Sequence, residues 1–151
     1  MLRTRLSDAL KVGMKAKESL TVATIRLILA ALKDRDIAAR SKGNMEGVPD
    51  DEILSMFQSM IKQRRESVDM YEKGGRPELA KKEALEIEII KTFLPEQLDD
   101  AAVAAAIDAA VADMAAVSLK DMGKVMGALK ERYAGRMDFS RASASIKERL
   151  S

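Results

Sequence analysis

The sequence contains no cysteine and no histidine among its 151 residues. Without cysteine there is no disulfide, no thiolate nucleophile and no thiolate metal ligand. Without histidine the chain lacks the commonest metal ligand and the side chain that most often acts as a general base near neutral pH. The Ser-His-Asp and Cys-His arrangements of hydrolases are therefore excluded. We predict no cofactor and no metal site, and we assign no catalytic residue.

Aromatic residues are also scarce, with no tryptophan, three phenylalanines and two tyrosines. Hydrophobic residues nevertheless reach 47%, so a core can be built from Leu, Ile, Val, Met and Ala. Such a core suits packed helices better than a β-sandwich, whose strands favour aromatic and β-branched residues. The composition therefore predicts an all-α protein.

No long hydrophobic run is present. The most apolar stretch, residues 21–32, contains Arg26 and is much shorter than the roughly 20 residues that a membrane-spanning helix needs. The N-terminus is rich in charge between Arg3 and Lys11 and has no apolar segment typical of a signal peptide. We therefore expect a cytoplasmic protein without a membrane partner.

Helical periodicity predicts four helices in the first part of the chain. Apolar residues recur at helical spacing over four segments, near residues 2–17, 19–39, 50–73 and 77–94. The segment 41–49, which has two Gly, an Asn and a Pro, predicts a mobile loop. Gly74-Gly75 is a typical helix stop, and Pro77 is a typical first residue of the next helix.

Pro95 marks the predicted boundary between two modules, because proline disfavours helix at the residue before it. After it, Asp99 and Asp138 are expected N-caps, and Ser118 with Asp121 forms a variant of the capping box. The predicted domains are an N-terminal four-helix module over residues 1–94 and a C-terminal three-helix bundle over residues 95–151.

Charge is distributed unevenly along the chain. Residues 1–42 carry ten Lys or Arg and four acids, and residues 43–94 carry eight and eleven. Residues 95–117 have five acids and no base, whereas residues 118–151 have eight bases and four acids. The two basic ends suit contacts with phosphates, and an ordinary solvated surface explains them equally well.

The predicted helix near residues 118–133 places two glycines on a basic face. At about 100° per residue its apolar residues share one side. The opposite side carries Lys120, Gly123, Lys124, Gly127 and Lys130. Each interior glycine costs roughly 1 kcal/mol relative to alanine, so two on an exposed face require a reason. Close approach of a sugar-phosphate chain is one reason, and tight packing of the N-terminal module or of another copy is a second. The third alternative is that the two glycines have no consequence.

A second basic cluster lies in the third predicted helix, at residues 62–65. Arg64 shares the apolar stripe of that helix, so we expect its stem to pack and its guanidinium to pair with an acid. Glu86 and Glu88 are expected to be ordinary exposed residues. No pair of carboxylates is marked as an acid/base dyad.

Several stretches of the chain resemble the YqeY-like proteins, also called the GatB/YqeY family, which are small bacterial proteins. The matching stretches, in order, are residues 24–26, 62–67, 71–76, 86–90, 93–98 and 121–127. They run through nearly the whole chain at consistent spacing. The resemblance implies a bacterial protein.

The resemblance also implies a C-terminal module similar to the tail of the B subunit of the tRNA-dependent amidotransferase. In that enzyme the tail touches tRNA, whereas ammonia production and amide transfer reside in other domains. A label of carbon–nitrogen ligase with glutamine as amide donor would be inherited from the larger enzyme. Its catalytic cradle, glutaminase and nucleotide site have no counterpart in this chain.

We therefore predict a helical adaptor, rather than a free-standing enzyme, that binds tRNA or another RNA through its C-terminal module. The predicted RNA-binding residues are Lys120, Gly123, Lys124, Gly127, Lys130, Arg132, Arg136 and Arg141. One alternative is a protein-interaction module without RNA binding, assembling with the translation or amidotransferase machinery. Another is an accessory of glutamine-dependent amidotransferase activity. The sequence leaves the oligomeric state open.

Overall fold

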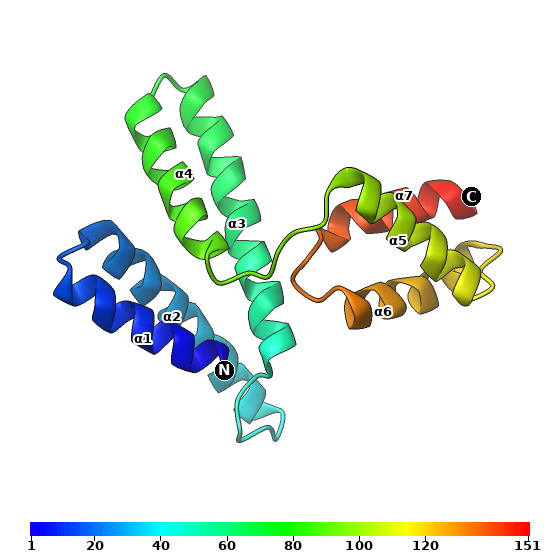
Figure 1. Cartoon of the computed structure of the whole chain (residues 1–151), viewed down its shortest axis with the longest axis horizontal. Coiled ribbons are helices and arrows are strands. Elements are labelled where there is room, and N and C mark those ends of the chain that lie inside the picture. Colours follow the sequence, from blue (N-terminus) through cyan, green and yellow to red (C-terminus); the bar gives the residue numbers. More distant parts are fainter. The chain divides into compact units, whose positions relative to one another are not determined.

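A computed structural model describes all 151 residues and is helical throughout, with no strand (Figure 1). The all-α prediction is therefore confirmed. Seven α-helices and one short 3-10 helix form two compact units, Met1–Leu94 and Pro95–Ser151. Each unit has a hydrophobic core of its own. We call them the N-terminal unit and the C-terminal unit and describe each by itself.

Two helix pairs make up the N-terminal unit: α1 (Leu2–Lys15) with α2 (Ser19–Ser41), and α3 (Asp50–Lys73) with α4 (Pro77–Lys91). In Figure 1 the two pairs meet near the start of α3 and diverge towards their turns. The core consists of Leu, Ile, Val, Met and Phe side chains. The fully buried Ile25, Phe57 and Ile90 show that α2, α3 and α4 all contribute to it.

Helix ends in the N-terminal unit follow from local residue chemistry. Three acids occupy the first turn of α3, where the positive end of the helix dipole favours negative charge. Gly75 follows α3 with φ +72°, a conformation that glycine adopts without a steric penalty. Pro77 is the first residue of α4, so its missing N–H removes no helical hydrogen bond.

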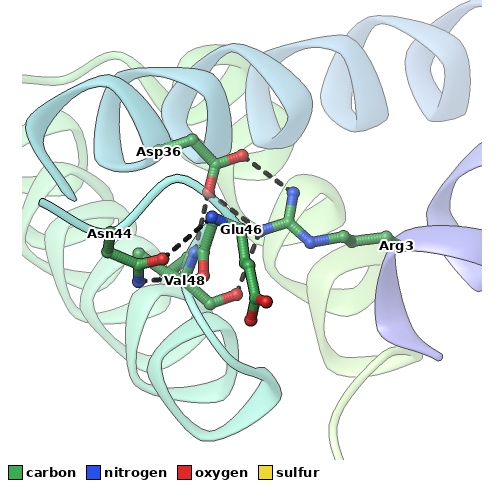
Figure 2. A network of polar contacts seen from close by, with 6 residues as sticks. Arg3, Asp36, Asn44, Glu46 and Val48 are labelled. Carbon is green, nitrogen blue, oxygen red and sulfur yellow. Dashed lines mark hydrogen bonds and ion pairs between the residues drawn. The ribbon is translucent and has the colours of Figure 1, made fainter. Parts of the chain in front are cut away.

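An arginine clamp fixes the end of the loop between the two pairs (Figure 2). Arg3 donates from Nη1 and Nη2 to the two carboxylate oxygens of Asp36, each at 2.8 Å, and from Nη2 to the Val48 carbonyl at 3.0 Å. The Val48 N–H donates to Asp36 Oδ1 at 3.0 Å. The Arg3 guanidinium, helped by this N–H, lowers the pKa of Asp36 to about 2. Gly47 lies against the clamp at φ +94°, and an added Cβ would lie 2.8 Å from Arg3 Nη2.

A second ion pair joins α3 to α4. Arg64 Nε donates to Glu86 Oε2 at 3.0 Å, and the two side chains are only 13% and 10% exposed. The expected pairing of Arg64 with an acid is confirmed. The expectation that Glu86 is exposed is wrong, because Glu86 precedes Ile87 on the side of α4 that packs against α3. Glu88 is exposed, as expected.

The C-terminal unit contains α5 (Asp100–Asp113), the 3-10 helix η1 (Leu119–Asp121), α6 (Met122–Arg132) and α7 (Phe139–Leu150). The predicted caps are confirmed. Asp99 accepts from the Ala102 N–H at 2.7 Å, and Asp138 accepts from the Ser140 N–H at 2.9 Å. Asp121 accepts from the Ser118 N–H at 3.2 Å. One difference is that the helix predicted from Ser118 begins with the separate 3-10 turn η1.

Candidate nucleic-acid interface

The exposed side of α6 carries the two glycines singled out from the sequence. Val125, Ala128 and Leu129 point into the core of the C-terminal unit, whereas Gly123 and Gly127 are exposed. A Cβ added at either glycine would meet no atom within 4 Å. Alanine would therefore fit at both positions, and close packing within the C-terminal unit does not account for glycine there.

Three lysines accompany the glycines, and all three are exposed. Lys120 lies in η1, and Lys124 and Lys130 lie in α6. None of them takes part in an ion pair. Together they form a surface of bare backbone and free ammonium groups, which we call the basic glycine face. It consists of Lys120, Gly123, Lys124, Gly127 and Lys130.

Asp121 lies at the start of this face and is held by backbone groups. Its carboxylate accepts from the N–H groups of Val117 at 2.9 Å and Ser118 at 3.2 Å. These hydrogen bonds hold the pKa of Asp121 below its usual value, and the charge of Lys124 lowers it further. Asp121 therefore stays ionised as a cap of η1.

The three arginines predicted for the rim of the interface differ in their surroundings. Arg132 Nη1 pairs with Asp113 Oδ2 of α5 at 2.9 Å. Arg136 Nε donates to the Glu96 carbonyl at 3.0 Å, and its guanidinium carbon lies 6.0 Å from the centroid of the Tyr133 ring. Both arginines thus have contacts within the unit that their sequence positions did not reveal.

Arg141 is the third, and it lies in the first turn of α7, exposed and without an ion pair. The structure thus brings the five residues of the basic glycine face together on η1 and α6. The arginines stand at other places and two of them have partners. The RNA-binding role of all eight residues stays a prediction.

Positive and negative charges are nearly balanced in the C-terminal unit. The unit has eight Lys or Arg and nine Asp or Glu, a net charge of −1. Two carboxylates of α5, Asp113 and Asp108, pair with Arg132 and Arg149. The acidic helix therefore neutralises arginines of α6 and α7, whereas the three lysines beside the glycines form no ion pair. Asp121, on which the charge of Lys124 acts, and the exposed Glu131 are the acids next to these lysines in η1 and α6.

No group of three acidic side chains lies close enough together to hold a metal ion. None of the helices combines the length and apolar character that crossing a membrane requires.

The chain is similar to known proteins along most of its length. The family model described as "Yqey-like protein" matches residues 3–150. "Altered inheritance of mitochondria protein 41, mitochondrial" of Lachancea thermotolerans is 35% identical over 109 residues, which is 72% of this chain and 55% of that protein. Its namesake in Eremothecium gossypii is 35% identical over 91 residues, 59% of this chain and 46% of that protein. The chain spans about half the length of the curated relatives it matches.

These relatives overturn two expectations. They are proteins of yeasts and are named mitochondrial, so the expectations of a bacterial protein and of a cytoplasmic location are wrong. The location was inferred from the lack of a membrane span and of a signal peptide. Neither feature distinguishes the cytoplasm from the interior of an organelle, which explains the error.

The segments that carry the resemblance in the sequence begin at Thr24 and end at Gly127. The family match includes all of them and extends beyond them on both sides. Because it covers far more than half of the sequence, the resemblance is confirmed. The chain belongs to the family of YqeY-like proteins.

Proposed function

We propose that this chain binds tRNA or another RNA through the basic glycine face and acts as an adaptor rather than as a free-standing enzyme. One observation carries the proposal: the space above Gly123 and Gly127 is empty to 4 Å, although both glycines lie in an exposed helix. Each of them weakens α6 relative to alanine, so a contact made outside the unit is a reason for them.

The chemistry of this face suits a sugar-phosphate backbone. Because glycine has no Cβ, it lets a sugar-phosphate backbone come closer to the helix than any other residue at that position would. Unpaired lysine ammonium groups are mobile point charges that reach phosphates from several directions.

The same residues favour recognition of shape over recognition of bases. The basic glycine face has no aromatic side chain on which an unpaired base could stack. Its one aromatic neighbour in sequence, Tyr133, lies near the Arg136 guanidinium. We therefore expect contacts with phosphates and riboses of a folded RNA such as tRNA, with little dependence on sequence.

A titration of labelled tRNA at two salt concentrations tests the proposal. If about four phosphates are neutralised, affinity should fall on the order of 100-fold between roughly 50 and 200 mM salt. The double variant Lys120→Glu with Lys124→Glu should bind at least about tenfold more weakly at the lower salt concentration.

The matched control is Lys81→Glu with Lys82→Glu, two exposed residues of α4 that give the same change in net charge. It should retain most of the affinity. If both double variants lose affinity equally, the attraction is general rather than local to this face. If Lys120→Glu with Lys124→Glu binds like the original chain, the assignment of this face is wrong.

Gly127→Ala distinguishes the effect of Gly127 on stability from its effect on RNA binding. Alanine meets no atom there and should raise the free energy of unfolding by about 0.5–1 kcal/mol, measured by urea unfolding. RNA affinity should fall in the same variant because the added methyl group blocks close approach. Higher stability with unchanged affinity would show that RNA does not approach this point. Loss of a protein partner in Gly127→Leu, with no RNA binding at all, would favour the protein-interaction alternative.

Free-standing amide transfer is not part of this proposal. The chain has neither histidine nor cysteine, and none of its acids gathers into a metal site. Purified protein incubated with glutamine, ATP and misacylated tRNA should release no ammonia. Formation of amidated tRNA would contradict the adaptor assignment.

A further inference from the structure

The N-terminal unit has an exposed helix face that folding does not explain. One side of α2 is buried in the core through Ile25, Ile28 and Leu32. The opposite side presents two parallel rows of exposed residues, each with a step of seven. One row is Ala23, Ala30 and Ile37, and the other is Arg26, Lys33 and Arg40. We call these two rows the α2 face.

The cationic row is evenly spaced, and two acids of the same helix lie near it: the charge of Arg40 acts on Asp36, and the exposed Asp34 follows Lys33. At about 1.5 Å per residue, neighbouring cations stand roughly 10 Å apart along the helix and the row covers about 21 Å. None of the three takes part in an ion pair. Since residues 1–42 carry ten bases and four acids, this part of the chain attracts anionic partners.

Apolar side chains are exposed beside the cations. Ile37 belongs to the first row and is 50% exposed, and Leu27 on the same side of the helix is 51% exposed. Ala23 and Ala30 are small, so a partner can come close to the helix axis between them. The face therefore combines apolar contact area with a line of charge.

A hollow continues this face towards the turn between α1 and α2. It has a volume of about 340 Å³ and is lined by Met14, Lys17, Ser19, Val22, Ala23 and Arg26. Ala23 and Arg26 are the first residues of the two rows, so the hollow and the rows are continuous. Met14, a flexible side chain that is 52% exposed, can adapt to an inserted apolar group.

We infer that the α2 face docks an amphipathic helix of another protein that carries Asp or Glu at every seventh residue beside an apolar stripe. Two helices that pack side by side meet again on the same faces every seven residues. Each carboxylate of such a partner would stand opposite one cation, and its apolar stripe would cover the alanines and Ile37. An apolar residue near its end would enter the hollow.

The pattern fits this partner better than a nucleic acid. Along the axis of a duplex each strand presents a phosphate at roughly every 3.4 Å, whereas the cations recur at three times that rise along the axis of α2. A sugar-phosphate chain also offers no apolar group to cover Leu27 and Ile37, which are about half exposed.

A second copy of this chain does not supply the partner helix. No helix of the chain carries three acids at steps of seven residues. The acids of α5 lie at 100, 108 and 113, and the last two already pair with arginines. The partner is therefore a different protein with an acidic helix.

Site-specific photocrosslinking in the native cells tests this inference. The probe is p-benzoylphenylalanine, placed in the full chain at Ala30 in the middle of the α2 face. A control probe replaces Leu85 of α4, which is 46% exposed. Mass spectrometry should map the Ala30 adduct to a partner segment with helical apolar spacing and acids at steps of seven.

Charge reversal makes the test specific. Arg26→Glu with Lys33→Glu should reduce the adduct at least tenfold, whereas Lys81→Glu with Lys82→Glu should leave it unchanged. Changing the mapped partner acids to lysine should restore the adduct with the reversed chain. Circular dichroism of each purified variant should give the helix content of the original chain, because all four positions are exposed.

Several results would overturn the inference: an adduct with RNA or lipid, an adduct with a segment that lacks the acidic repeat, or an adduct that survives the reversal. No adduct above that of the Leu85 control would overturn it as well. The inference is independent of the proposed RNA binding. Lys120→Glu with Lys124→Glu should keep the crosslink, and Arg26→Glu with Lys33→Glu should keep the tRNA affinity.

Discussion

The two units are both helical but hold their helices together in different ways. The core of the N-terminal unit is built from large side chains and contains no alanine among its fourteen buried members. Four of the nine buried core residues of the C-terminal unit are alanine: Ala106, Ala110, Ala128 and Ala142. Small side chains let helices approach closely but bury little apolar area per residue. The C-terminal unit therefore depends more on contacts at the ends of its helices.

Polar contacts differ in burial. Each unit joins separate elements with two side-chain ion pairs, but the carboxylates of Asp36 and Glu86 are 19% and 10% exposed, whereas those of Asp113 and Asp108 are 52% and 66% exposed. The C-terminal unit caps its helices and ties its first segment to the turn before α7. There Gln97 Nε2 donates to the Gly135 carbonyl at 2.5 Å. The comparison indicates that loss of a charge partner costs more stability in the N-terminal unit, where the paired carboxylates are more buried, than in the C-terminal unit.

The largest expected effect comes from breaking the buried ion pair. Arg64→Met leaves the Glu86 carboxylate buried without a partner and should lower the free energy of unfolding by about 3 kcal/mol, measured by urea unfolding. The exposed neighbour Arg65→Met is the matched control and should have little effect. The double variant Arg64→Met with Glu86→Leu should recover most of the loss. If it does not, packing rather than charge accounts for the effect.

An intermediate effect is expected from the arginine clamp, and it depends on pH. The pKa of Asp36 is lowered to about 2, from roughly 4 in an unfolded chain, so ionised Asp36 stabilises the folded state. That stabilisation is fully present above about pH 4 and is lost as the pH falls through about 2. Because Arg3 is 40% exposed, solvent screening reduces the contribution to roughly 1 kcal/mol.

Asp36→Asn should therefore lower stability at pH 7 and flatten its decline between pH 4 and 2, followed by chemical unfolding at each pH. Asp34→Asn, at an exposed position of the same helix, should keep the original pH profile. Identical profiles for both variants would show that the clamp does not contribute. Of the two ion pairs on which the contrast between the units rests, that result would leave only Arg64–Glu86.

The smallest effect is expected at a helix cap of the C-terminal unit. Asp138→Ala removes the acceptor for the Ser140 N–H and should cost about 1 kcal/mol or less. Hydrogen exchange should increase in α7, while exchange in α3 and α4 stays as before. Asp138→Ser keeps a capping oxygen and should behave like the original chain. Faster exchange in both units would mean that they unfold together and would weaken the comparison.

Most helix boundaries could be predicted because their signals are local. Asp99 and Asp138 bond to N–H groups two or three residues away, and Pro77 acts through its own ring. Burial of Glu86 could not be predicted in this way, because it depends on a helix 22 residues earlier in the chain. Its position next to Ile87 was the available signal. The Asp36 clamp was missed for the same reason, since it joins residues 33 apart.

The candidate interface was predicted only in part. Helical periodicity placed the lysines and glycines on one side of α6, and the structure shows them exposed there. Helical periodicity gives no information on contacts with other helices. Arg132 was therefore grouped with the lysines, although it forms an ion pair with Asp113. The α2 face was overlooked because its apolar residues look like core in sequence. Only the structure shows which side of α2 is covered.

The clamp around Asp36 also divides the loop before α3 into two parts with different uses in protein engineering. At Gly43 an added Cβ meets no atom within 4 Å, although its φ of +92° disfavours a side chain, so the first part of the loop has room for a fluorophore or a short peptide tag attached beside this glycine rather than at it. At Gly47 the same addition collides with Arg3, which holds Asp36 and Val48. A label meant to report on this unit without disturbing it therefore belongs near Gly43.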